Sequence, residues 1–219
     1  MEKGNKIKRF ISVLLVLAMV FGMSTSVFAG ESMDANSNSS LKAEMINDHT
    51  MRFSENGVVE TVEVRENQVI YNNQKTGEKI VLTVDGNRVH SSATGETIVV
   101  TDEEAEELID MISSDTHPQS TTKMFSYAKI KSALGGTATI AAIAGAIVGL
   151  LSAAGYSAPE MLPEILELVK GISGLAALIM NGSSDHGIKV TLKEKKRRAV
   201  RQGKEYYVWV WSVTGISKY

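Results

Sequence analysis

The four histidines, His49, His90, His117 and His186, are the side chains best suited to move protons or bind a metal near neutral pH. They lie far apart, so the sequence contains no helical histidine pair of the kind that binds zinc. Asp185 precedes His186, but both lie in a Gly/Ser turn where solvent will surround them. No G-x-S-x-G elbow, phosphate-binding glycine loop or cysteine is present. We therefore expect no catalytic residue, metal or cofactor, and no enzymatic activity.

A cationic and aromatic cluster near the C-terminus is better suited to binding. Its basic residues are Lys193, Lys195, Lys196, Arg197, Arg198, Arg201 and Lys204. Its aromatic residues are Tyr206, Tyr207, Trp209 and Trp211. Cations attract anionic head groups, and Trp and Tyr favour the membrane interface. We predict that the cluster binds an anionic membrane or envelope polymer. A solvated hairpin tip is the alternative, and nucleic acid is not expected because the cluster is short.

Two strands are expected to carry this cluster. Apolar residues alternate at Ile188, Val190 and Leu192, and aromatic residues alternate from Tyr207 onward. Such alternation predicts a β-hairpin, and residues 194–203 are expected to be its connecting loop. The basic side chains would then lie on a loop above an aromatic strand.

A long uncharged stretch points to membrane chemistry. Twenty-eight consecutive residues between Lys131 and Glu160 have no charge. As a helix, residues 137–154 would rise about 27 Å, close to the roughly 30 Å hydrocarbon core of a bilayer. Small residues recur at every fourth position and include a G-x-x-x-G motif, which favours a close helix neighbour. The candidate membrane-inserting residues are Ile140, Ile143, Gly145, Ile147, Gly149, Leu150 and Leu151.

A second apolar helix is predicted from Pro163 to about Met180, so that the two form an apolar helical hairpin. We expect the small-residue groove of the first helix to pack against this second helix. Three interpretations of the hairpin stay open at this point. It is a buried core, a segment folded away in a precursor that inserts into a bilayer on release, or a constitutive membrane anchor.

The N-terminus is typical of a secretory signal. Four basic residues precede an apolar stretch, and Val27-Phe28-Ala29 fits a cleavage site, so residues 1–29 are predicted to be a signal peptide. A retained N-terminal anchor is the alternative. The mature protein is expected to be secreted and associated with the cell envelope. Residues 30–49 are small and polar at first and are expected to be a disordered lead-in. Without cysteine the protein has no disulfide and no lipid attachment at a processed N-terminus.

Residues 50–113 are expected to be an antiparallel β-meander followed by a short helix. Five short β-type runs between residues 58 and 100 are separated by turns that contain glycine. Two of the resulting hairpins, starting at Val64 and Val84, repeat a common pattern that ends in T-G-E-x-I-V. Thr101 and Glu104 then form a capping box that predicts a helix over residues 102–113.

Charge divides the chain. Residues 30–117 have eighteen acidic and six basic residues, whereas residues 118–219 have six acidic and thirteen basic residues. The balances of −12 and +7 predict two modules that attract each other, joined by a linker at residues 114–125. The basic module, residues 126–219, contains the helical hairpin and the C-terminal β-hairpin. The predicted class is therefore α+β.

These features favour a secreted bacterial precursor with a cationic, membrane-active C-terminal module, held soluble by an acidic N-terminal module. A bacteriocin-like, pore-forming or membrane-binding protein would fit. We expect such a protein to have a dedicated immunity protein as a partner and to form oligomers when it inserts. The alternative is a non-toxic envelope-binding or structural protein in which the helical hairpin stays buried.

Overall fold

The computed structural model describes residues 41–101, 118–156, 159–201 and 204–219. These belong to one compact unit of residues 39–219. The predicted signal peptide, the lead-in up to residue 40 and the predicted helix at 102–113 lie outside the described residues. The described elements are helices and antiparallel strands, which confirms the α+β class.

Seven strands form an antiparallel sheet in which every strand pairs with its neighbour in sequence. They are β1 (Lys42–Asn47), β2 (Thr50–Glu55), β3 (Val58–Arg65), β4 (Gln68–Asn73), β5 (Lys79–Asp85), β6 (Arg88–Ser91) and β7 (Thr97–Val99). The turn between β2 and β3 has positive φ at Asn56 and Gly57, as a tight two-residue hairpin turn requires. The meander is thus confirmed from β2 onward. Strand β1 corrects the prediction for residues 42–47, which pair with β2 through the backbone although most of their side chains are exposed.

The repeat in the sequence has a structural counterpart in two turns. The Gly77 N–H donates to the Asn73 carbonyl, and the Gly95 N–H donates to the Ser91 carbonyl, each at 2.9 Å. Both glycines have positive φ, a conformation that residues with a Cβ rarely adopt. The repeated T-G-E residues therefore build the same turn twice.

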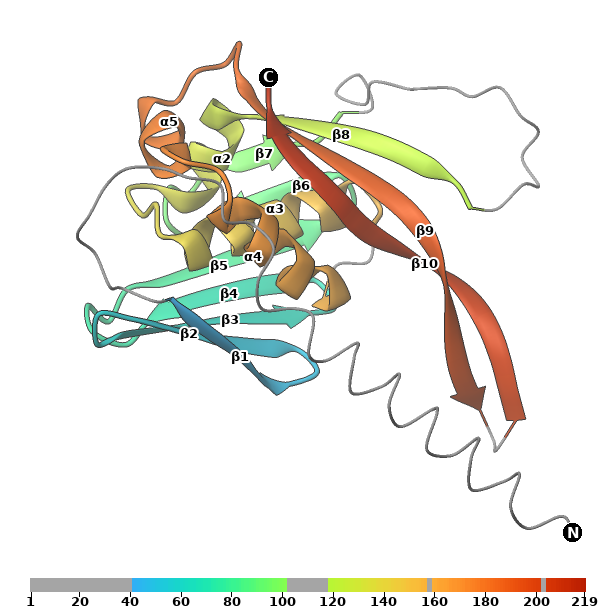
Figure 1. Ribbon diagram of the computed structural model, residues 1–219. Coiled ribbons are helices and arrows are strands. Elements are labelled where there is room, and N and C mark those ends of the chain that lie inside the picture. The colour runs from blue at the N-terminus through green and yellow to red at the C-terminus, as the bar shows by residue number, and fades with distance from the viewer. Residues whose placement is uncertain (1–40, 102–117, 157–158, 202–203) are drawn as a thin grey trace, which may run out of the picture. The chain divides into compact units, whose positions relative to one another are not determined.

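The second half of the chain adds helices and a smaller sheet. Its elements are β8 (Ser120–Ser126), α2 (Tyr127–Leu134), α3 (Ile140–Ala153), the short 3-10 helix η2 (Pro159–Met161), α4 (Leu162–Lys170), α5 (Leu175–Asn181), β9 (Gly187–Arg201) and β10 (Lys204–Lys218). The three strands pair in the order β10-β9-β8. Helix α3 contacts strands β3 to β6, and α4 contacts α3 and β10. The helices therefore lie between the two sheets and share one hydrophobic core with both (Figure 1).

Three predictions for this half need correction. Residues 120–125 were expected to belong to a linker, but they pair with β9 as part of β8 and bury Phe125. Helix α2 was not predicted. Ser126 caps it by accepting from the Lys129 N–H, and Gly135 ends it. The single helix expected from 163 to 180 is instead two helices, α4 and α5, because the chain bends over residues 171–174 and Gly174 has a φ of 71°.

Helix α3 is the centre of the core. Every residue from Ala141 to Leu151 is buried. A Cβ added at Gly149 would lie 3.1 Å from Leu82 Cδ1, and one added at Gly145 would lie 3.3 Å from Val62 Cγ1. We expected the small-residue groove to pack against the next helix, but its glycines pack against the meander. In this structure the uncharged stretch is a core helix, and its insertion into a bilayer stays a prediction.

The predicted boundary in residues 114–125 does not separate two cores. The Ser91 Oγ, which is fully buried, donates to the Ala133 carbonyl of α2 at 2.7 Å. The Lys129 Nζ donates to the Val99 carbonyl of β7 at 2.9 Å. The meander and the helices are thus joined by polar contacts as well as by apolar packing.

Candidate functional site

Strands β9 and β10 extend beyond the rest of their sheet. Strand β8 pairs with β9 only from Gly187 to Lys193, whereas β9 and β10 pair along their full length. Beyond that point the two strands continue as a twisted pair that projects from the helices (Figure 1). We call residues 194–201 and 204–211 the distal ribbon. Within the described residues, β10 has no strand on its other edge.

The basic cluster lies on a strand and not on the expected loop. Strand β9 continues to Arg201, and β10 begins at Lys204, so the predicted connection over residues 194–203 is mostly strand. The partner strand explains this extension, because aromatic and β-branched residues of β10 lie opposite the long stems of the basic residues. Such cross-strand pairs stabilise a β-ribbon.

The register divides the distal ribbon into two faces, because successive side chains on a strand point to opposite sides. The first, which we call the cation–aromatic face, contains Lys196, Arg198, Tyr207 and Trp209, and Glu194, Val200, Glu205 and Trp211 lie on the same side. The second, which we call the helix-side face, contains Lys195, Arg197, Tyr206, Val208 and Val210. The seven predicted cations therefore do not act together on one surface.

The cation–aromatic face is open to solvent. Lys196 lies opposite Trp209, and its Nζ lies 5.0 Å from the centroid of the Tyr207 ring. Tyr207 is 63% exposed and Trp209 is 38% exposed. Arg198 forms an ion pair with Glu205 across the ribbon. An ammonium group held over an exposed aromatic ring presents charge and apolar surface at the same place.

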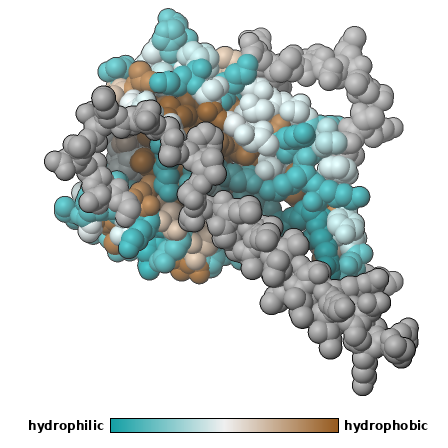
Figure 2. Space-filling model, in the orientation of Figure 1, coloured by the Kyte–Doolittle hydropathy of each residue, from teal (hydrophilic) through white to brown (hydrophobic). Residues whose placement is uncertain are grey.

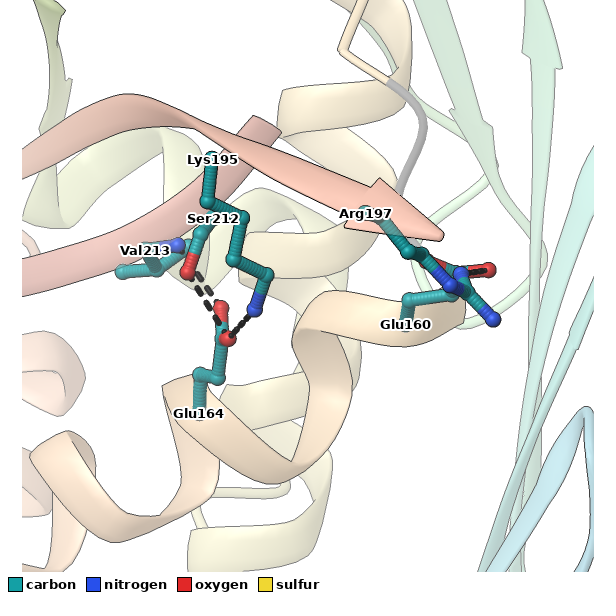
Figure 3. A network of polar contacts seen from close by, with 6 residues as sticks. All are labelled: Glu160, Glu164, Lys195, Arg197, Ser212 and Val213. Atoms are coloured by element: carbon teal, nitrogen blue, oxygen red, sulfur yellow. Dashed lines mark hydrogen bonds and ion pairs between the residues drawn. The ribbon is translucent and has the colours of Figure 1, made fainter. Parts of the chain in front are cut away.

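Two carboxylates, of Glu164 and Glu160, contact the helix-side face (Figure 3). Glu164 of α4 accepts from the Lys195 Nζ at 2.7 Å, the Ser212 Oγ at 2.8 Å and the Val213 N–H at 2.8 Å. Glu160 forms an ion pair with Arg197. Lys195 and Arg197, two of the predicted surface-binding cations, are therefore paired within the protein, where they connect the ribbon to α4 and η2.

Trp211, one of the predicted interfacial aromatic residues, packs against the core. Its ring is partly buried and meets the Tyr156 ring edge-on, with centroids 5.2 Å apart. The Lys123 Nζ lies 5.6 Å from the centroid of the same Tyr156 ring. Together with the Glu164 contacts, this packing attaches the ribbon to the core.

The remaining predicted residues lie elsewhere. Lys193 is exposed and lies at the last residue of β9 that pairs with β8. Arg201 is the last residue of β9 and Lys204 is the first residue of β10, and their side chains lie outside the described part of the structure. The seven candidate membrane-inserting residues all belong to α3, where Ile140 is partly buried and the other six are buried. Among the helices of the described residues, none is long and apolar enough to cross a membrane.

Glu160 and Glu164, which contact the ribbon, were not predicted to be site residues. A signal was present, because two carboxylates four residues apart at the start of a helix lie on one side of it. Their partners, Lys195 and Arg197, are two residues apart on one face of a strand. Four residues of a helix and two residues of a strand both span about 6 to 7 Å, so the two spacings match when the helix runs along the strand, an arrangement that depends on the tertiary fold.

The histidines show no shared site. His49, His90 and His186 are exposed, and His117 lies outside the described residues. Within the described ranges no three His, Asp or Glu side chains gather in a way that could hold a metal ion.

The face drawn in Figure 2 separates two kinds of surface. Hydrophobic residues gather over the helical side, whereas the ribbon is coloured from hydrophilic to intermediate. No known family, curated protein sequence or solved structure matches the chain. The function must therefore be inferred from the site itself.

Proposed function

We propose that the protein is a secreted bacterial factor that binds anionic membranes through the cation–aromatic face of the distal ribbon. The observation that carries this proposal is the position of Lys196, opposite Trp209 and over the exposed Tyr207 ring, on a ribbon that pairs with no third strand among the described residues. Each basic residue near an anionic leaflet contributes about 1 kcal/mol of attraction. Trp and Tyr side chains prefer the head-group region of a bilayer, next to the anionic groups that attract the basic residues.

A bacteriocin-like antagonist is the form of this function that we favour. The meander covers the apolar helix α3, which is compatible with a role in keeping that segment out of contact with water and lipid until a target is reached. Disruption of the target membrane would require α3 to leave its contacts with Val62 and Leu82.

Binding without membrane damage is the second candidate function. It is favoured by the burial of every α3 residue from Ala141 to Leu151, because α3 packs between the meander and α4. In that case the ribbon would attach the protein to an anionic lipid or wall polymer, and the helices would serve only as its core.

Vesicle sedimentation tests the binding surface. The chain from residue 30, which contains the whole compact unit, would be mixed with phosphatidylglycerol or phosphatidylcholine vesicles. We expect binding to the anionic vesicles only. Lys196→Gln should weaken it about fivefold, the equivalent of about 1 kcal/mol. Lys195→Gln is the matched control, because it removes the same charge from the same strand at a position already paired with Glu164. Equal losses in both variants would contradict the assignment to one face.

A disulfide across the core separates the two candidate functions. The chain has no cysteine, so Leu82→Cys with Gly149→Cys creates a single pair. The Cβ added at Gly149 lies 3.7 Å from Leu82 Cβ, within the range that a disulfide requires. If the protein damages membranes by releasing α3, dye leakage from anionic vesicles should occur only after reduction of this variant. Vesicle binding without leakage in the reduced and unmodified proteins would support attachment alone.

A further inference from the structure

A cavity of about 400 Å³ lies where the meander meets the start of α3. Its apolar lining includes Leu41, Phe53, Val58, Ala138 and Ile140. Its polar lining consists of Glu55, Asn56, Glu60, Asn73 and Thr139. The volume falls within the range of small-molecule sites, which combine apolar walls with a few placed polar groups. None of the residues that line it belongs to the ribbon.

Glu60 is the unusual member of this lining. It lies in the middle of β3 and is only 8% exposed. Its Oε1 accepts from the Tyr71 hydroxyl at 2.7 Å and from the Asn73 Nδ2 at 3.0 Å. Among the described residues, no hydrogen bond or ion pair reaches its Oε2, and no Lys or Arg contacts the carboxylate. A buried carboxylate without a cation is expensive unless a positive group can approach it.

The surroundings hold this carboxylate in place. The Thr139 Oγ1 caps α3 by accepting from the Ala142 N–H and lies 3.5 Å from the Tyr71 hydroxyl. Burial, together with the hydrogen bond to Glu60, raises the pKa of Tyr71 to about 12, so this hydroxyl stays a donor at neutral pH. One oxygen of Glu60 is thus fixed by two donors, which leaves the other available to a ligand.

The charge of the cavity limits what can bind there. Glu55 and Glu60 are both acidic, and no basic residue lines the cavity. The apolar walls would bury hydrocarbon, and the Glu60 Oε2 would accept from an N–H group. We infer that this cavity binds a small organic cation, a primary ammonium group attached to an apolar body.

Titration with hexylammonium chloride tests this inference, with 1-hexanol and sodium hexanoate as neutral and anionic probes of the same length. Calorimetry would use the chain from residue 30. We expect hexylammonium to bind at least tenfold more tightly than 1-hexanol, and hexanoate not to bind. Glu60→Gln keeps the size of the side chain and an oxygen acceptor, and should weaken hexylammonium binding at least tenfold.

Glu63→Gln is the matched control. Glu63 lies three positions along the same strand, so it points to the opposite face, and it pairs with Arg65. The Glu63→Gln variant should bind hexylammonium as tightly as the unmodified protein does. Ala138→Leu, which adds bulk to the lining, is a second variant that should block both hexylammonium and 1-hexanol even if Glu60→Gln folds poorly. Absence of hexylammonium binding at millimolar concentration, or equal binding by the Glu60 and Glu63 variants, would overturn the inference. Neither outcome bears on vesicle binding by the ribbon.

Discussion

Helix α3 and the distal ribbon use apolar side chains in opposite ways. In α3 no residue is charged, and every residue from Ala141 to Leu151 is buried. In the ribbon, the four consecutive basic residues Lys195 to Arg198 lie on β9, and Tyr207 and Trp209 are exposed on β10. The apolar surface of α3 therefore stabilises the fold, whereas that of the ribbon is exposed to solvent and contributes little to stability. Substitutions in the two regions should separate unfolding from binding.

The largest expected effect is in the core. Ile147→Ala in α3 removes a fully buried side chain and should lower the free energy of unfolding by about 4 kcal/mol, as cavity-forming substitutions do. Urea denaturation would measure it. Val200→Ala in the ribbon, where the side chain is 63% exposed, is the matched control and should change stability by less than about 0.5 kcal/mol. Similar losses in the two variants would break the comparison.

High pH should destabilise the core through Tyr71. Because burial raises its folded-state pKa to about 12 from the usual 10, its contribution to stability is complete below pH 10 and is lost as pH rises through 12. From pH 9.5 to 11.5 we expect the loss from this group to be about 2 kcal/mol. Tyr71→Phe lacks the titrating hydroxyl. Between pH 9.5 and 11.5 its free energy of unfolding, measured by urea denaturation, should therefore fall by about 2 kcal/mol less than that of the unmodified protein. Parallel pH profiles for the two proteins would exclude this role.

The junction between ribbon and core should show an intermediate effect. Glu164→Gln removes a charge that contacts Lys195, Ser212 and the Val213 amide, and should cost about 1 kcal/mol. Hydrogen exchange at the Val213 amide should also accelerate. Glu160→Gln breaks only the exposed pair with Arg197 and should change stability by less than about 0.5 kcal/mol. If the Glu160 variant were the more destabilised of the two, our assignment of the anchor would be wrong.

The smallest effect on unfolding is expected at Lys196. Lys196→Gln removes an exposed cation–aromatic contact and should change the free energy of unfolding by less than about 0.5 kcal/mol, in urea denaturation, while vesicle binding weakens. This combination sharpens the comparison, because it assigns a side chain to binding and not to the fold. A large loss of stability would instead make Lys196 a structural residue.

Much of the fold could be predicted from the sequence where local patterns decide the structure. Alternating apolar residues and glycine turns identified the meander from β2 to β7 because each hairpin is stabilised by its own turn and partner strand. The C-terminal hairpin was found for the same reason. Strand β1 was missed because its apolar alternation, at Leu41, Ala43 and Met45, is short and most of its side chains are exposed, so that backbone pairing with β2 holds it.

Long-range contacts decided the rest. The glycines of α3 indicated a close neighbour, but helical periodicity alone does not say whether that neighbour is a helix or a sheet. The basic cluster was identified by composition, yet its division into two faces depends on the register with β10. The contacts of Glu164 and the Glu60 cavity join segments far apart in the chain, so the spacing of Glu160 and Glu164 did not by itself identify their partners.

The strand order of the meander also bears on how the protein folds. Each of its strands pairs with the preceding one, so a chain that emerges from its N-terminus can form these hairpins one after another from local contacts. Strands β3 to β5, which contact α3, precede it by more than fifty residues. We expect the most apolar segment of the protein to emerge when the surface that covers it has already formed, which shortens the time in which it is open to aggregation.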